Sequence, residues 1–288
     1  MLGGCCSLRS RKPSELPRIA RQTGNRAQFV WHSDTKRRPS TLARTGDRTY
    51  RNQTMSKLRI DVWSDIACPW CFVGKRRLEA ALERFPHADQ VEVVWRSFEL
   101  DSSAPREVDT TKSHAERLAK KYGMSVAQAQ SRTEQLKQTA RGAGIEFDFD
   151  HIRPGNTFDA HRLIHLAEKL GMQGAMKERF MLAYLSQGEA IGDPKVLQRL
   201  ALEVGLPAAE VEQVLASDAY STDVRSDELQ ARELGINGVP FFVFDERLAA
   251  SGAQPVEVLL GALDQAWKER APEPVALAEG AVCGPDGC

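Results

Sequence analysis

The sequence lacks any uninterrupted run of 18 apolar residues, so it predicts no helix that spans a membrane. It also lacks the bias of collagen-like or strongly disordered chains, because 42% of its 288 residues are hydrophobic and 27% are charged. A net charge of either sign is absent too, since 39 Lys and Arg balance 39 Asp and Glu. The composition is therefore that of an ordinary globular protein with one large domain or two small ones.

The balanced charge hides an uneven distribution along the chain. Residues 1–54 contain 12 Lys and Arg but only 3 Asp and Glu, whereas the rest of the chain contains 27 and 36. The acidic remainder argues against a nucleic-acid partner. The basic leader has few apolar residues and no helical or strand period, so we expect residues 1–54 to be disordered.

The leader has no apolar core of the length that a secretory signal needs, so we expect no export and a cytoplasmic protein. Met55 opens the first segment that reads as a strand, and the preferred interpretation of residues 1–54 is upstream sequence without a function. An Arg-rich and acid-poor leader is also typical of an organelle transit peptide, which is the alternative.

After the leader, the hydrophobic pattern predicts a strand, a helix and a second strand. Leu58, Ile60 and Val62 alternate with other residues at the period of a strand. Apolar residues then recur at helical spacing between Cys71 and Phe85, and the segment Val91–Phe98 is rich in β-branched and aromatic residues. This order predicts a βαβ unit.

Only helical patterns follow over the next 130 or so residues. The segment 239–244 then reads as a buried strand, and a turn, a short partner strand and a helix from Pro255 come after it. We therefore expect an α/β protein. Its parts are a domain formed by residues 55–100 and 236–270, a helical insertion domain at 101–235, and a tail at 271–288.

Two cysteines lie where the first strand turns into the helix, in the segment Cys68-Pro69-Trp70-Cys71. Pro69 suits the first helical position, where its missing N–H would have no partner. Cys68 would then lie at the positive end of the helix dipole, which stabilises a thiolate near neutral pH. Cys71, one turn inside, would attack a mixed disulfide formed at Cys68. The pattern predicts thiol–disulfide exchange, with Pro69 and Trp70 shaping the approach of the substrate.

A second cysteine pair ends the chain, in the segment Cys283-Gly284-Pro285-Asp286-Gly287-Cys288. Its central Pro and Asp favour a type I turn, which can bring two Cα atoms within the ~4.4–6.8 Å that a disulfide requires. We expect Cys283 and Cys288 to act as a tethered relay for Cys68 and Cys71. Two alternatives stay open: the terminal cysteines are merely exposed, or all four cysteines bind zinc or a softer metal ion.

Three further segments complete the pattern: Ser64-Asp65-Ile66-Ala67, Asn156-Thr157-Phe158-Asp159-Ala160-His161-Arg162, and Gly238-Val239-Pro240-Phe241-Phe242. Together with the two cysteine pairs they resemble a thioredoxin-fold protein of the DsbA class, in its FrnE-like branch. The resemblance spans about residues 57–270. It implies a thioredoxin-like fold interrupted by a large helical insertion, and a protein-disulfide oxidoreductase or isomerase with no bound cofactor.

The resemblance also implies that the Val239–Pro240 peptide bond is cis and faces Cys68. The backbone groups of Val239 would then pair with an extended substrate strand, whereas the alternative is an ordinary strand start. His161 and His165 lie toward the edge of the apolar face of their helix, and a surface pair is the default interpretation. The family segment nevertheless makes His161 a candidate neighbour of the dithiol that tunes the thiolate. Without a carboxylate pattern beside these histidines, no metal site is predicted.

The sequence thus predicts an enzyme that acts on proteins with disulfides or thiols, with a thiol electron donor such as thioredoxin or glutathione. In a reducing cytosol it would reduce or reshuffle disulfides rather than introduce them. The alternatives are a metal-binding protein that uses the four cysteines and a glutathione-dependent isomerase of small molecules. Related isomerases have Ser in place of the first cysteine, whereas this chain keeps both.

Overall fold

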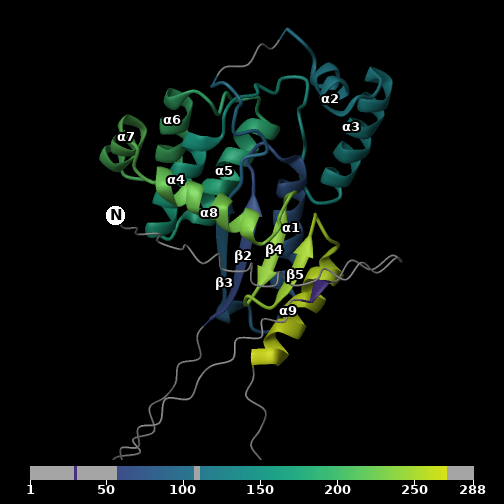
Figure 1. The fold of residues 1–288 in the computed structure, drawn as a ribbon, viewed down its shortest axis with the longest axis vertical. Helices are drawn as coiled ribbons and strands as arrows, with labels where there is room; N and C mark the ends of the chain where they lie inside the picture. The colour runs from purple at the N-terminus through teal and green to yellow at the C-terminus, as the bar shows by residue number, and fades with distance from the viewer. Residues whose placement is uncertain (1–28, 31–56, 107–110, 271–288) are drawn as a thin grey trace, which may run out of the picture.

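A mixed β-sheet forms the lower part of the molecule, and most of the helices lie above one end of it (Figure 1). The computed structural model describes residues 29–30, 57–106 and 111–270. Over these residues the sheet has five strands in the order β1-β5-β4-β2-β3. β2 and β3 are parallel, and the other pairs are antiparallel. The strands are β1 (Phe29–Val30), β2 (Leu58–Ser64), β3 (Val91–Ser97), β4 (Phe241–Phe244) and β5 (Leu248–Ser251).

The helices fall into two groups, as the sequence predicts for a thioredoxin-like fold with a helical insertion. α1 follows β2 and α9 follows β5, whereas the other seven α-helices of the described residues lie between β3 and β4. The first group is α1 (Pro69–Glu83) and α9 (Val256–Arg270). The insertion contains α2 (His114–Tyr122), α3 (Val126–Arg141), α4 (Phe158–Lys169), α5 (Gln173–Leu185), α6 (Pro194–Val204), α7 (Ala208–Ala216) and α8 (Ser221–Glu233). A short 3-10 helix, Ala88–Gln90, precedes β3.

Local sequence signals account for several helix ends. The Asp193 side chain accepts a hydrogen bond from Lys195 N at the start of α6, Pro194 occupies the first turn, and Gly205 ends the helix with a positive φ. Ser113 and Glu116 form a reciprocal capping box at the start of α2. None of the helices in the described ranges is both long and apolar enough to cross a bilayer.

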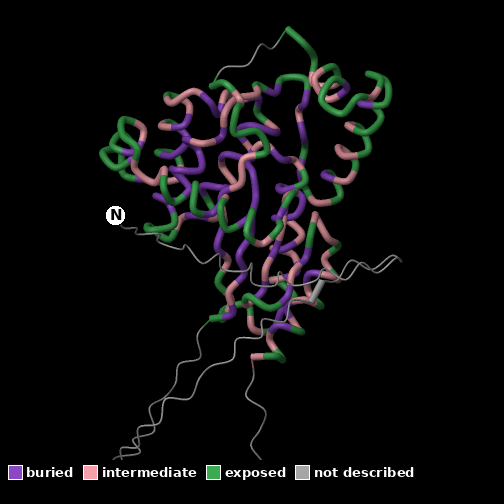
Figure 2. Tube along the Cα trace, in the orientation of Figure 1, coloured by how far each residue is buried: buried purple, intermediate pink, exposed green. Residues whose placement is uncertain are grey.

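Two apolar clusters hold the sheet and the insertion together. The first lies between the sheet and the pair α1 and α9, and it includes Ile60, Leu78, Phe244 and Leu263. The second joins α1 to the insertion, because Cys71 and Phe72 belong to the same cluster as the buried residues of α4 and α5. Buried residues accordingly continue from the strands into the helices above them (Figure 2). α1 is therefore the element on which both parts of the fold pack.

The segment expected to be disordered contributes one short strand. β1 pairs with β5, with Phe29 opposite Ala249 and Val30 opposite Leu248. The sequence pattern did not indicate this strand. The remainder of residues 1–54 lies outside the described residues.

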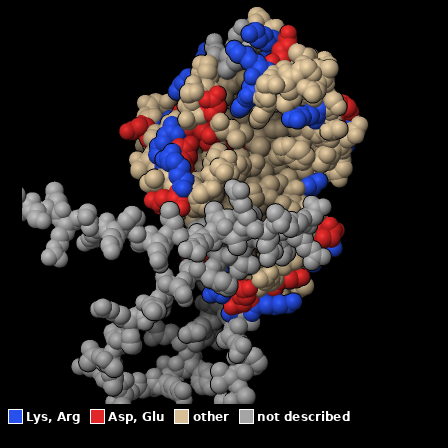
Figure 3. Space-filling view, turned by 45° about the vertical axis from the view of Figure 1, so that its right-hand side comes forward, with Lys and Arg blue, Asp and Glu red and all other residues tan. Residues whose placement is uncertain are grey.

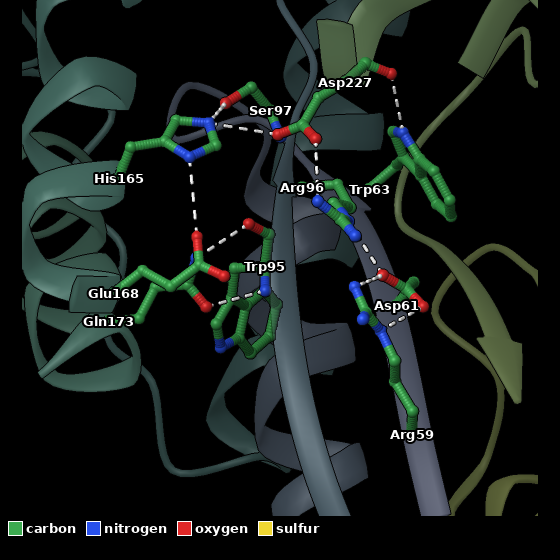
Figure 4. A network of polar contacts seen from close by, with 10 residues as sticks. All are labelled: Arg59, Asp61, Trp63, Trp95, Arg96, Ser97, His165, Glu168, Gln173 and Asp227. Carbon is green, nitrogen blue, oxygen red and sulfur yellow. Dashed lines mark hydrogen bonds and ion pairs between the residues drawn. The ribbon is translucent and has the colours of Figure 1, made fainter. Parts of the chain in front are cut away.

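Inserted helices also cover the outer edge of β3, which no strand of the described residues pairs with. The Gln173 side chain at the start of α5 accepts a hydrogen bond from Trp95 N at 2.9 Å and donates one to Trp95 O at 3.0 Å. Asp227 of α8 accepts a hydrogen bond from Ser97 N at 2.8 Å (Figure 4). Side chains of the insertion therefore occupy the outward-facing backbone groups of Trp95 and Ser97, as a further strand would.

Candidate active site

The cysteines of the Cys-Pro-Trp-Cys segment lie at the start of α1. β2 ends at Ser64 and α1 begins at Pro69, so Cys68 is the residue that precedes the helix. It is the N-cap residue of α1, where the first backbone N–H groups have no partner within the helix, and its side chain makes no capping hydrogen bond. Cys71 lies one turn further and donates its backbone N–H to Cys68 O at 3.0 Å. Both are free thiols; Cys68 is 5% exposed and Cys71 is fully buried.

The loop before β4 lies directly against Cys68. The Val239–Pro240 peptide bond is cis, and Cys68 Sγ donates to Val239 O over 3.7 Å. The Val239 N–H donates no hydrogen bond within the described residues. α1 approaches this loop closely because residue 74 is glycine, and a Cβ there would lie 2.8 Å from Pro240 Cγ. Gly74 therefore sets the distance between the dithiol helix and the cis-proline loop.

Two exposed apolar residues belong to segments next to the dithiol. Trp70, between the two cysteines, is 43% exposed, and Leu100 is exposed to the same extent. Leu100 belongs to this region because its N–H donates to Asp65 Oδ2 in the loop that precedes Cys68. In Figure 3, where the side of the molecule that carries α2 and α3 comes forward, much of the surface of the helical part is uncharged. We call Trp70 and Leu100 the apolar rim of the site.

A buried carboxylate and a buried imidazole lie behind the loop that leads to Cys68. His161 Nε2 is 3.4 Å from Asp65 Oδ1, and both side chains are almost completely buried. Burial would raise the pKa of Asp65, but the contact with His161 and the Leu100 N–H hold it below its ordinary value. Burial lowers the pKa of His161. The pair is therefore a carboxylate and a neutral imidazole, and His161 Nδ1 has no hydrogen-bond partner in the described part of the chain.

A buried lysine lies on the insertion side of the dithiol. Lys177 of α5 is 0% exposed, and its Nζ donates to Ser64 O at 2.8 Å, at the end of β2. Burial lowers the pKa of Lys177 to about 8, while the charges of Cys71, Asp65 and Cys68 oppose that shift. Burial also raises the pKa of the Cys71 thiol well above its ordinary value, and the contact with Cys68 adds to this effect. The Lys177 ammonium acts on Cys71 in the opposite direction.

A second polar cluster lies further along α4, at the outer edge of β3 (Figure 4). His165 Nε2 is 3.1 Å from Asp227 Oδ2 and 3.1 Å from Ser97 Oγ, while its Nδ1 faces Glu168 at 3.5 Å. Although burial opposes it, contact with Asp227 and Glu168 raises the pKa of His165 to about 9. Arg96 connects the cluster to the sheet through Asp227 at 3.1 Å and Asp61 at 2.7 Å. This charged network ties α4 and α8 to β2 and β3.

The interpretation of His161 and His165 as a surface pair is wrong. His161 is 0% exposed and His165 is 7% exposed, because every residue of α4 from Asp159 to Ala167 is buried. Periodicity assumes that a helix has one solvent face, and α4 has none over this stretch. His161 contacts Asp65 in the loop that leads to Cys68, and its expected effect on the thiolate stays a prediction.

Sequence reasoning gave no role to Asp65 or Lys177. Asp65 lies three residues before Cys68, within the segment Ser64-Asp65-Ile66-Ala67, which carries part of the family resemblance. Lys177 had a signal of its own, since it precedes Phe180 by three residues and Tyr184 by seven and so shares their apolar helix face. A lysine on such a face is buried only where it has a specific neighbour.

Some predicted site residues lie outside the described residues. This applies to Cys283 and Cys288, and therefore to the relay and to the four-cysteine metal site. Within the described ranges, no group of three or more His, Cys, Asp or Glu side chains is placed to hold a metal ion.

A family model of the DSBA-like thioredoxin domain matches residues 59–264. This chain belongs to that family, whose class is oxidoreductase or isomerase. The crystal structure of a probable DsbA oxidoreductase from Streptomyces coelicolor is 46% identical, with a TM-score of 0.70 over 80% of this chain and 98% of that one. An uncharacterised Bacillus subtilis protein, YwbO, is 30% identical over 199 residues, which are 68% of this chain and 91% of YwbO.

The fold is shared with an enzyme of another reaction type. A structure of 2-hydroxychromene-2-carboxylate isomerase matches with a TM-score of 0.53 over 73% of this chain and 97% of that one. The identity is 14%, so the likeness is one of fold.

Proposed function

We propose that the protein is a thiol–disulfide oxidoreductase and isomerase that acts on protein disulfides through Cys68 and Cys71. The observation that carries this proposal is the 3.7 Å contact between Cys68 Sγ and the Val239 carbonyl. It joins a sulfur at a helix start to a backbone segment that an extended chain can pair with.

In the proposed reduction, the Cys68 thiolate attacks one sulfur of a substrate disulfide, and the other substrate sulfur leaves as a thiolate that takes up a proton. Cys71 then attacks Cys68 Sγ in the mixed disulfide and releases the second substrate thiol. The products are a substrate dithiol and a Cys68–Cys71 disulfide, so two electrons pass to the substrate. Isomerisation follows when another substrate thiol resolves the mixed disulfide before Cys71 does.

The substrate would bind as an extended chain. The unpaired Val239 N–H and the Val239 carbonyl offer it two backbone hydrogen bonds. Pro69 shapes the backbone after Cys68, and Pro240 shapes the loop whose Val239 carbonyl faces Cys68. Exposed Trp70 would offer an apolar contact to the residues that flank the substrate cysteine. These contacts would recognise the substrate backbone and apolar side chains rather than a particular sequence. Such recognition suits an enzyme that acts on many proteins.

We place the reaction in the cytoplasm, where it would reduce or reshuffle disulfides with electrons from a thiol donor such as thioredoxin or glutathione. A reduction potential near thioredoxin's ~−270 mV agrees with this direction, and one near ~−120 mV reverses it. We also propose Cys283 and Cys288 as the second redox pair of a FrnE-like protein. Replacing both by Ser lowers turnover if they relay electrons, and unchanged turnover removes the relay.

Cys68→Ser and Cys71→Ser test the main proposal. With insulin as substrate and glutathione as donor, we expect Cys68→Ser to abolish reduction, because no nucleophile remains at the helix start. Cys71→Ser is expected to accumulate a mixed disulfide at Cys68, which mass spectrometry detects. Reduction by Cys68→Ser at the rate of the unmodified protein would exclude the proposed reaction.

A glutathione-dependent isomerase of small molecules is the second candidate function, and the fold shared with 2-hydroxychromene-2-carboxylate isomerase favours testing it. In such an enzyme glutathione itself supplies the sulfur. Isomerisation of such a substrate would therefore persist in Cys68→Ser, while insulin reduction would be absent in every form of the protein. The four-cysteine metal protein is tested by metal content after purification under reducing conditions.

A further inference from the structure

The helices α2 and α3 form a hairpin that stands apart from the other inserted helices (Figure 1). We call residues 114–141 the basic hairpin, because they contain six Lys and Arg but only two Glu. The rest of the chain after residue 54 contains 21 Lys and Arg against 34 Asp and Glu. Many residues of the basic hairpin are exposed (Figure 2). An exposed positive patch on an otherwise acidic protein attracts anionic groups.

Most of the positive charges of the basic hairpin are not neutralised within the protein. Its ion pairs with carboxylates of the described residues are those of Lys137 and Arg141. The helix dipole favours cations in the last turn of α2, but this effect does not reach the first half of α2 or the middle of α3. Four basic side chains therefore form no ion pair within the described ranges and are available to a partner: Arg117, Lys120, Lys121 and Arg132.

The turn between α2 and α3 presents apolar surface beside these charges. Tyr122 is 61% exposed and Val126 is 40% exposed. The turn is firmly built, since Gly123 ends α2 with a positive φ, and Ser125 and Gln128 form a capping box at the start of α3. A partner that meets this turn finds apolar contact and positive charge together, without having to order the backbone first.

The basic hairpin is attached to the dithiol helix by a series of aromatic contacts. The ring of Phe72, which directly follows the dithiol on α1, lies 6.3 Å from that of Phe147, and Phe147 lies 5.2 Å from Phe149. Phe149 stacks on His114 at the start of α2, with 4.6 Å between the ring centroids. Ala140 of α3 belongs to the same buried cluster as the two cysteines. The basic hairpin is therefore fixed to the helix that carries the dithiol.

We propose that the basic hairpin docks acidic segments of the proteins whose disulfides Cys68 attacks, an inference that rests on the proposed function. Carboxylates of such a segment pair with the four available cations, and an aromatic or aliphatic side chain contacts Tyr122 and Val126. Because the basic hairpin is fixed to α1, docking raises the effective concentration of the substrate disulfide at Cys68. The acidic segment is a second recognition element beside the backbone pairing at Val239.

The charge of the rest of the chain favours a polypeptide over a larger polyanion. A nucleic acid or an anionic bilayer extends beyond the basic hairpin and would also meet the acidic remainder of the chain, which repels it. A short acidic segment can contact the basic hairpin alone. The proposed partner is therefore an acidic stretch of a substrate protein.

Binding is measured without any redox step. A fluorescent peptide that contains several Asp and Glu, one Leu and no Cys is titrated with the full-length reduced protein, and its anisotropy is followed. We expect it to bind more tightly than a peptide of equal length with Lys in place of the acidic residues, and to bind more weakly as ionic strength rises. Lys120→Gln combined with Lys121→Gln is expected to weaken binding by about fivefold, because two exposed ion pairs are lost.

A matched double variant separates the position of these charges from their number. Lys195→Gln combined with Lys268→Gln removes two exposed lysines of α6 and α9, and we expect it to leave the affinity unchanged. Tyr122→Ser is expected to weaken binding by about threefold through the lost apolar contact. Equal affinities for the two peptides, or equal losses in the two double variants, would overturn the proposal. Tighter binding of an oligonucleotide or of an anionic vesicle than of the acidic peptide would also overturn it.

Turnover distinguishes this inference from the proposed function. Two peptide disulfides have identical residues beside their cysteines and differ in an acidic or a basic flanking segment. We expect the unmodified protein to reduce the acidic one with the lower KM, and Lys120→Gln with Lys121→Gln to raise that KM toward the value for the basic one. If the unmodified protein reduces neither peptide, the proposed function fails; if it reduces both with equal KM, only the present inference fails.

Discussion

His161 and His165 lie one turn apart on α4 and are both buried, yet their surroundings shift their pKa values in opposite directions. His165 has partners at both nitrogens, and its pKa is raised to about 9. Within the part of the chain that the structure describes, His161 has one long contact to Asp65 and no partner for Nδ1, and burial lowers its pKa. One imidazole is held as a cation and the other is held neutral.

The difference separates a cluster whose charges are all paired from one whose polar groups are not. At the edge of β3, charges of both signs alternate along Arg96, Asp227 and His165, so each has a counter-ion. Beside the dithiol, Lys177 pairs with no carboxylate of the described residues and His161 Nδ1 has no partner among them, although both side chains are fully buried. Incompletely paired buried groups cost stability, and such groups are concentrated at functional sites.

The largest expected effect comes from breaking the paired cluster. Asp227→Asn leaves the His165 imidazolium and Arg96 without their shared carboxylate inside the protein, and we expect a loss of about 3 kcal/mol in the free energy of unfolding. Urea denaturation at neutral pH measures it. Asp223→Asn on the exposed side of α8 is the control, with an expected change below about 0.5 kcal/mol. Equal losses for the two variants would contradict the distinction.

The pH dependence of stability tests the same cluster with a smaller effect. The pKa of His165 is about 9 in the folded protein, whereas an unfolded histidine titrates near ~6.5. Its contribution is therefore fully present below the unfolded pKa and is lost as pH rises through about 9. In His165→Gln we expect this loss between neutral and alkaline pH to disappear from the unfolding free energy. An unchanged slope would show that His165 is not the group that titrates.

The smallest expected effect concerns His161, whose lowered pKa has the opposite sign. As pH falls below ~6.5, histidine in the unfolded chain binds a proton, whereas His161 in the folded protein stays neutral because its pKa is lowered. The free energy of unfolding therefore decreases toward acidic pH. His161→Gln keeps a donor for Asp65 and removes this loss, and we expect a change below about 1 kcal/mol at neutral pH. Urea denaturation at mildly acidic and at neutral pH measures the acid loss of stability and the change at neutral pH. Substitution of an exposed histidine, His151→Gln, is the control.

Much of the fold could be predicted from local patterns, because each signal depends on neighbouring residues alone. The alternation in β2 and the caps of α6 are of this kind. The cis bond before Pro240 was predicted from the family resemblance, because the residues around it do not distinguish a cis-proline loop from an ordinary strand start. The placement of Cys68 before α1 followed from its position between a strand and a first-turn proline.

The rest of the site depends on contacts between distant segments. Lys177 meets Ser64 across 113 positions of the chain, and His161 meets Asp65 across 96. Periodicity placed His161 toward solvent because it cannot show that α4 is surrounded on all sides. The pairing of Phe29–Val30 with β5 likewise depends on a partner more than 200 positions away, and two residues are too few to show a period.

The way Gln173 and Asp227 meet the backbone of β3 bears on attempts to shorten this protein. The helices between β3 and β4 could be removed to obtain a minimal redox module. Trp95 and Ser97 would then lose the Gln173 amide and the Asp227 carboxylate that bind their outward-facing backbone groups. The shortened chain would expose the unpaired edge of β3, and pairing of this edge between copies of the chain would compete with refolding. The insertion therefore protects the sheet from self-association, whatever it contributes to chemistry.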